Sequence, residues 1–188
     1  VGIIERDRIV DGRSIAEGDV IVGLGSSGLH TNGYSLVRRV LADNPGLLET
    51  EVNGRPVLDV LLDVHRPYYP ALKPLFEMKA IKGAAHITGG GIAENLNRIL
   101  PNNVDAAVRL ERYRPAAIFN LLREAGSISD ADMLRTFNLG VGMALVVSSD
   151  ELEATLNSLK QSGCPAFEIG SIVPGSGHVQ LRGHIGWR

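Results

Sequence analysis

The stretch Gly23-Leu24-Gly25-Ser26-Ser27-Gly28-Leu29-His30-Thr31-Asn32-Gly33 decides how the fold of this chain is interpreted. It follows Asp19–Leu24, where Val20, Ile21 and Val22 predict a strand, and precedes Tyr34–Asp43, where apolar residues recur at helical spacing. Glycine allows close backbone approach and a positive φ without strain. A strand–loop–helix of this kind directs N–H groups and a helix N-terminus at one point, which suits an anion.

A second glycine-rich loop, Thr88-Gly89-Gly90-Gly91, has the same setting. The short apolar run Ala84–Thr88 predicts a strand before it, and Ile92–Leu100 predicts a helix after it. We therefore expect an oxyanion or phosphate site where the two loops meet. A third stretch, Met133–Met143, places Arg135 and Asn138 beside two glycines, and an arginine there could grip a phosphate or carboxylate.

The rest of the chain alternates strands and helices, with hairpin signals that favour a mixed sheet. Asn53-Gly54 predicts a turn between short strands. Thr31 or Asn32 is a candidate N-cap for the helix at Tyr34–Asp43. The further strands are expected at Ile3–Val10, Val104–Leu110, Val141–Val147, and in a terminal hairpin of Phe167–Val173 with His178–Arg182. The further helices are expected at Val57–Val64, from Arg66 to about Lys79, and at Pro115–Ala125, Asp130–Arg135 and Asp150–Gln161.

Composition limits the classes of function. The 188 residues are 44% hydrophobic and carry a formal net charge of −2, which is ordinary for a globular protein and argues against nucleic acid as a partner. The longest apolar runs are too short for a transmembrane helix, and the first residues do not resemble a signal peptide. The single cysteine, Cys164, fits a reducing, cytoplasmic setting, and we expect it to be inert. The missing initiator Met suggests a domain cut from a longer protein.

The motifs allow three other interpretations. Gly23, Gly25 and Gly28 match a dinucleotide fingerprint, but no second strand ending in an acid follows the helix. Either glycine loop could also be only a tight structural turn. His178 and His184 lack metal-ligand spacing, and no metal site built by this chain alone is expected. His30 and His86 each lie beside a glycine loop and are retained as candidates.

Together, Gly25–Arg38, His86–Gly91 with Glu94-Asn95, and Arg135–Met143 resemble the C-terminal domain of phosphoribosylformylglycinamidine cyclo-ligase, also called AIR synthetase. The order and spacing match along nearly the whole chain. The resemblance implies an α+β fold, a mixed sheet with packed helices that is loosely ferredoxin-like, formed by residues 1–188 as a single domain. It also implies a missing N-terminal domain, because no acidic Asp-x-x-x-x-Gly-Ala-x-Pro segment is present.

For the complete enzyme the resemblance implies ATP-dependent ring closure of formylglycinamidine ribonucleotide in purine synthesis, releasing aminoimidazole ribonucleotide, ADP and phosphate. ATP and Mg²⁺ would bind mainly on the missing domain, which would also form a homodimer. The isolated chain would be inactive. We expect no membrane partner.

The candidate site residues divide into two groups. His30 and Asn32 are the candidate catalytic residues, expected to project from the mouth of the first loop, with His30 holding the substrate phosphate or moving a proton. The candidates for substrate or phosphate binding are Ser26, Ser27, Thr31, Gly33, Thr88, Gly89, Gly90, Gly91, Asn95, Arg135 and Asn138. Two segments depart from the family pattern: Val64-His65-Arg66-Pro67, where many relatives have Pro-Thr-Arg, and Asn97-Arg98, where Pro-Arg is common.

Two alternatives remain open. One is a related enzyme, such as the amidotransferase of the preceding step, or a selenophosphate or thiamine-phosphate kinase. The Thr31–Ser35 loop sequence argues against these. The other is a stand-alone phosphate-ligand-binding or regulatory domain without catalysis.

Overall fold

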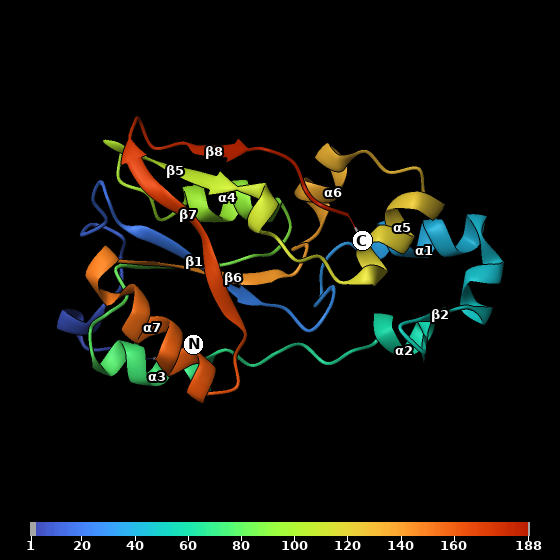
Figure 1. Ribbon diagram of the computed structural model, residues 1–188, viewed down its shortest axis with the longest axis horizontal. Helices are drawn as coiled ribbons and strands as arrows, with labels where there is room; N and C mark the ends of the chain where they lie inside the picture. Colours follow the sequence, from blue (N-terminus) through green and yellow to red (C-terminus); the bar gives the residue numbers. More distant parts are fainter. Residues whose placement is uncertain (1–2, 188) are drawn as a thin grey trace.

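A six-stranded sheet forms the centre of the computed structural model, which describes residues 3–187 (Figure 1). The strand order is β4-β6-β1-β7-β5-β8, and every neighbouring pair is antiparallel except β5 with β8. The strands are β1 (Val20–Gly25), β4 (Gly83–His86), β5 (Val104–Arg109), β6 (Val141–Val147), β7 (Ala166–Pro174) and β8 (Val179–Arg182). A separate two-stranded ribbon pairs β2 (Glu51–Val52) with β3 (Arg55–Pro56).

Helices pack on both faces of this sheet, so the central strands are apolar on both sides. In β1, Ile21 packs into one core, and Val22 and Leu24 into the other. The smaller core lies under α3 and α7, which run side by side (Figure 1). The helices are α1 (Tyr34–Asp43), α2 (Val57–Leu61), α3 (Tyr69–Glu77), α4 (Gly91–Asn97), α5 (Ala117–Ala125), α6 (Asp130–Thr136) and α7 (Leu152–Gln161). The expected α+β fold with a mixed sheet is confirmed.

The expected strand at Ile3–Val10 is wrong. Arg6–Arg8 form a single 3-10 turn, and the side chains of Ile3, Ile4 and Ile9 are exposed. Weak alternation of apolar residues did not produce a strand because no described sheet edge pairs with this segment.

The expected terminal hairpin is also wrong, because β5 lies between β7 and β8. The buried carboxylate of Asp105 explains this placement. It accepts hydrogen bonds from the backbone N–H groups of Ser176 and His178, each at 2.8 Å, and from Nε2 of Gln180 at 2.8 Å. The turn after β7 is thereby held on β5, and the chain continues along the far edge of β5.

These same hydrogen bonds lower the pKa of Asp105 to about 2. The pKa is below that of the unfolded chain, so the carboxylate stabilises the fold at neutral pH and loses this contribution as the pH falls from about 4 to 2. Asp105→Asn should destabilise the protein at pH 7, and the difference from wild type should shrink toward pH 2. Urea unfolding at several pH values measures this, with exposed Asp150→Asn as the control. A pH-independent difference would contradict the assignment.

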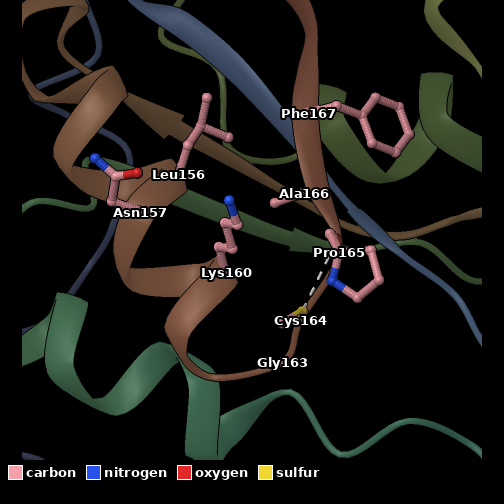
Figure 2. Close-up of a pocket in the computed structure, with 8 residues that line it drawn as sticks. All are labelled: Leu156, Asn157, Lys160, Gly163, Cys164, Pro165, Ala166 and Phe167. Atoms are coloured by element: carbon pink, nitrogen blue, oxygen red, sulfur yellow. Dashed lines mark hydrogen bonds between the residues drawn. The ribbon is translucent and has the colours of Figure 1, made fainter.

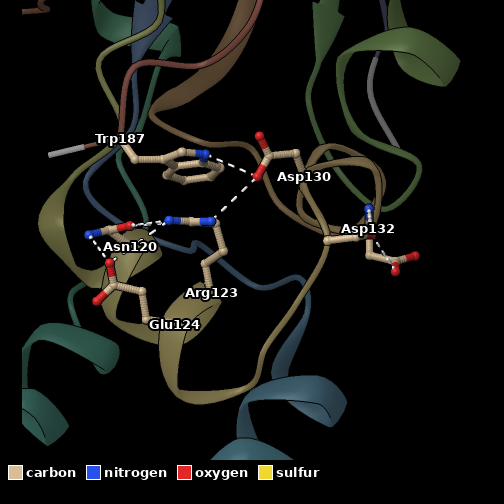
Figure 3. Close-up of polar contacts among 7 residues, drawn as sticks. Asn120, Arg123, Glu124, Asp130, Asp132 and Trp187 are labelled. Carbon is tan, nitrogen blue, oxygen red and sulfur yellow. Dashed lines mark hydrogen bonds and ion pairs between the residues drawn. The ribbon is translucent and has the colours of Figure 1, made fainter.

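The last described residues are fixed against the α5–α6 corner (Figure 3). Trp187 donates from Nε1 to Asp130 Oδ1 at 3.0 Å, and the Arg123 guanidinium lies 4.8 Å from the centre of the Trp187 ring. Arg123 also forms an ion pair with Asp130 at 3.7 Å. The segment after β8 therefore packs back onto the helices of the larger core.

Among residues 3–187, no helix is both long enough and apolar enough to cross a membrane.

Candidate functional site

The first glycine loop is held in place largely by its own polar side chains. Ser26 Oγ donates to Oδ1 of the buried Asn138 at 2.9 Å, and the backbone N–H of Gly140 donates to the same oxygen at 2.9 Å. Asn138 Nδ2 in turn donates to the Gly28 carbonyl at 2.9 Å. Ser26 and Asn138 were predicted to bind substrate, but the structure uses their hydrogen-bonding groups to fix the loop.

The second glycine loop is organised in the same way by Asn95. Its Nδ2 donates to the carbonyls of Gly91 at 2.8 Å and Gly89 at 3.2 Å, and its Oδ1 accepts from Thr88 Oγ1 at 3.1 Å. The N–H of Gly90 donates to the Arg135 carbonyl, and that of Gly91 to the Thr88 carbonyl, each at 3.0 Å. Of the three glycine amides expected to bind phosphate, two are therefore engaged within the protein.

The two loops nevertheless meet, as predicted. The imidazoles of His30, His65 and His86 gather at the junction, and their ligand nitrogens all lie within 4.8 Å of one another. The rings of His30 and His65 stack at 3.9 Å, and Tyr68 lies edge-on to His30 at 6.0 Å. A side chain on Gly89 would begin 4.0 Å from Asn32 Oδ1, so Asn32 of the first loop faces the second.

His30 lies beneath the loop rather than at its mouth, which corrects the expectation from the sequence. Its side chain is only 4% exposed, and its φ is +61°. Burial, and then the neighbouring His65, His86 and Arg66, lower the pKa of His30 to about 4. His30 is therefore neutral at physiological pH, and its Nε2 accepts a hydrogen bond from the Ser27 N–H at 3.2 Å.

This arrangement defines the chemistry available to His30. With Nε2 accepting, the proton of the neutral ring is on Nδ1, which is buried and has no hydrogen-bond partner among the described residues. A neutral, buried imidazole with a free N–H is suited to donating a hydrogen bond to a ligand oxygen. It is poorly suited to holding a phosphate by charge or to accepting a proton through Nε2.

The N-terminus of α1 has no side-chain cap, so the prediction of Thr31 or Asn32 as the N-cap is wrong. Gly33 is the N-cap residue, with φ +82°, and a side chain there would collide with the ring of Phe137. Thr31 is exposed and Asn32 is half-buried. Within residues 3–187, no side chain of the N-cap residue satisfies the first-turn amides of α1, and the Asn32 side chain makes no hydrogen bond.

The N-terminus of α4 offers a poorer anion site than that of α1. The carboxylate of Glu94 lies against Gly90 and occupies the place that a side chain on residue 90 would take. A second negative charge at this position would be repelled. Of the two loops, the first therefore has the better position for a phosphate.

The Arg135 guanidinium is engaged with groups other than the histidines. Its side chain is 71% exposed, forms an ion pair with Asp132 at 2.6 Å, and lines a cavity of about 490 Å³ between α1 and α6 that none of the three histidines lines. Its backbone carbonyl, rather than its guanidinium, is what contacts the second loop.

A further cavity of about 460 Å³ lies between α7 and β7, beside Cys164 (Figure 2). The thiol is buried, and this burial raises the pKa of Cys164, which agrees with the inert role expected from the sequence. Arg66 Nη1 approaches the Gly163 carbonyl at 3.5 Å, which links this region to the segment that carries His65.

His65 and Tyr68 are site residues that the sequence interpretation did not select. They lie between α2 and α3, and Ser27 Oγ ties this segment to the first loop by donating to the Val64 carbonyl at 2.7 Å. Tyr68 Oη also donates to the Gly25 carbonyl at 3.0 Å. The only available signal was the departure of Val64–Pro67 from the family pattern.

A family described as "AIR synthase related protein, C-terminal domain" matches residues 16–182. The chain belongs to this family. It is 42% identical over 181 residues to the phosphoribosylformylglycinamidine cyclo-ligase of Methylobacillus flagellatus, covering 96% of this chain and 52% of that protein. It is 45% identical to the enzyme of the same name from Caldanaerobacter subterraneus subsp. tengcongensis, covering 96% and 54%. The chain thus spans about half the length of these relatives.

Solved structures support the fold. A thiamine-monophosphate kinase from Stenotrophomonas maltophilia matches with a TM-score of 0.65 at 19% identity, covering 97% of this chain and 56% of that one. PurLQS from Thermotoga maritima matches with a TM-score of 0.58 at 17% identity, covering 96% and 26%. At these identities the likeness concerns the fold alone, which this AIR synthase-related domain shares with both.

Proposed function

We propose that this chain forms the C-terminal half of an ATP-dependent phosphoribosylformylglycinamidine cyclo-ligase. The observation that carries the proposal is the junction of the two glycine loops, where Asn32 faces Gly89 and His30 and His86 converge. The named relatives supply the reaction class, and the junction supplies a site of suitable chemistry.

In the proposed reaction, the formyl amide oxygen of formylglycinamidine ribonucleotide takes a phosphoryl group from ATP and ADP is released. The amidine nitrogen then attacks the activated carbon, and the oxygen leaves as inorganic phosphate as the ring closes. The uncapped first turn of α1 would receive the ribonucleotide phosphate. The Nδ1–H of His30 would donate to a substrate oxygen, and the half-buried amide of Asn32 would orient the formyl or amidine group because it both donates and accepts.

We propose that the missing N-terminal half binds ATP and Mg²⁺, completes a cytoplasmic homodimer, and packs beside this site. Leu62, Val64 and Tyr69 are 65%, 84% and 68% exposed, and they lie in or next to the segment that Ser27 holds against the first loop through the Val64 carbonyl. Exposed apolar side chains in such a cluster are typical of an interaction surface.

Reconstitution tests the proposal. The chain alone should show no ATP-dependent cyclisation, and mixing it with the N-terminal half of a relative, or fusing the two, should restore aminoimidazole ribonucleotide formation. If a folded fusion binds the ribonucleotide without turning it over, the domain is a ligand-binding or regulatory unit instead.

Asn32→Ala should lower turnover in the reconstituted enzyme at least about tenfold, which corresponds to ~1.4 kcal/mol of activation free energy. Stability should change little, because Asn32 neither caps α1 nor makes a side-chain hydrogen bond within the described residues. Steady-state kinetics and thermal unfolding measure the two effects, with exposed Asn157→Ala as the matched control. Full activity in Asn32→Ala would remove this residue from the proposed site.

A further inference from the structure

Three histidines from three separate segments converge at the loop junction. His30 lies in the loop after β1, His65 between α2 and α3, and His86 at the end of β4. The fold holds these segments together: Ser27 Oγ of the His30 loop donates to the Val64 carbonyl beside His65, and His86 pairs with Met143 of β6. The backbone positions of the three imidazoles are therefore set by the fold.

We propose that His30, His65 and His86 form a binding site for a borderline transition-metal ion such as Zn²⁺. One imidazole nitrogen from each residue lies within 4.8 Å of the other two. A tetrahedral zinc with Zn–N bonds of about 2.1 Å requires N–N separations of about 3.4 Å, so the nitrogens must move closer together and the His65 ring must turn out of its stack with His30. The proposal rests on this geometry, and it describes a state other than the one in which His30 acts on a substrate, because a metal ion on Nδ1 displaces the proton that would be donated there.

The unpaired, buried Nδ1 of His30 provides a second, independent observation. Its side chain is 4% exposed, yet Nδ1 has no hydrogen-bond partner among the described residues. Coordination through Nδ1 would move the ring proton to Nε2 and open the contact with the Ser27 N–H. That contact is 3.2 Å long, at the weak end of the range for such a bond.

The other two ligands can make the required adjustment. His65 is half-buried and His86 is exposed, so their rings have room to rotate. His65 must do so, because its ring lies 16° from parallel to that of His30 and stacked rings do not direct their lone pairs at one point. The exposure of His86 leaves the fourth coordination position accessible to water.

The donor set also selects the ion. Three neutral imidazoles without a carboxylate suit Zn²⁺, Co²⁺ or Ni²⁺, whereas Mg²⁺ and Ca²⁺ require oxygen ligands. Arg66 lies close enough to lower the pKa of His30, and its positive charge opposes any cation. We therefore expect weaker binding than at a site with thiolate or carboxylate ligands.

Metal titration of the 188-residue chain tests this proposal. Zn²⁺ should bind at one ion per chain by calorimetry, Co²⁺ should develop visible absorption of a tetrahedral complex, and Mg²⁺ should give no saturable binding. His65→Asn and His86→Asn should each weaken Zn²⁺ binding at least about tenfold, whereas His184→Asn, an exposed control, should bind as wild type does. Circular dichroism establishes that each variant is folded.

The Ser27 amide gives a readout specific to His30. Zn²⁺ should shift its NMR signal in the wild-type chain as the contact with His30 opens. Equal Zn²⁺ affinity in wild type and both cluster variants, loss of binding in His184→Asn alone, or no saturable binding up to millimolar Zn²⁺ would each overturn the proposal.

Discussion

Gly91→Ala should lower the free energy of unfolding by about 3 kcal/mol or more. The residue has φ +63°, where an L-residue costs ~1–2 kcal/mol, and its added methyl group would overlap the carbonyl oxygen of Leu134. The atoms that the methyl group would meet are all backbone atoms of Leu134 and Arg135. The backbone of α6 or of the second loop must therefore move, which adds the ~1–3 kcal/mol typical of overpacking. Urea unfolding monitored by circular dichroism measures the change.

Gly163→Ala is the matched control for this substitution. Gly163 has nearly the same φ, +67°, but nothing lies within 4 Å of the position that a side chain would take. It should therefore show only the backbone cost. Equal destabilisation of the two variants would show that the close contact with Leu134 is unimportant.

The glycines of the second loop make room for other parts of the protein. The sequence suggested that they let the backbone approach a ligand, but Gly91 lets it approach α6, and Gly90 accommodates Glu94. The same holds for Gly33, which accommodates Phe137. A glycine-rich sequence shows that something comes close, and it cannot show whether that neighbour is a ligand or the protein itself.

The elements of the fold were predictable wherever a local pattern decides them. The apolar strands β1 and β6 and the helix α1 appear where β-branched runs and helical spacing placed them. The path of β8 was not predictable, because it depends on Asp105 binding a turn that is 71 residues away in the sequence. The Ile3–Val10 alternation failed for the same kind of reason, since a strand also needs a partner.

The candidate site was predictable only in part. The meeting of the two loops followed from their matched settings. Which side chains stabilise the loops and which remain available to a ligand did not follow. Ser26, Asn138 and Asn95 are the short polar residues expected at a ligand, and in the structure their side chains brace the loops. His65 was missed because a lone histidine in a loop carries no spacing signal, and only the tertiary structure brings it to His30.

His30→Ala should lower turnover in the reconstituted enzyme by about 10²-fold or more, the usual effect of removing a buried donor to a developing negative charge. The reason is the free Nδ1–H described above, which has no partner within residues 3–187. His30→Asn should recover part of the loss, because an asparagine amide can place an N–H near the position of Nδ1 and asparagine tolerates the φ of +61°. His30→Gln, whose amide reaches the position of Nε2, should recover less.

The pH dependence separates hydrogen-bond donation from proton transfer. Because the pKa of His30 is about 4, its ring stays neutral from pH 6 to 9. The ratio of wild-type to His30→Asn turnover should then remain constant across that range. A ratio that changes sharply near pH 6.5 would show that His30 titrates during catalysis, and would return it to the role of a proton carrier. Kinetics must be compared at a temperature at which all variants are folded, since the left-handed backbone at this position penalises alanine and glutamine more than asparagine.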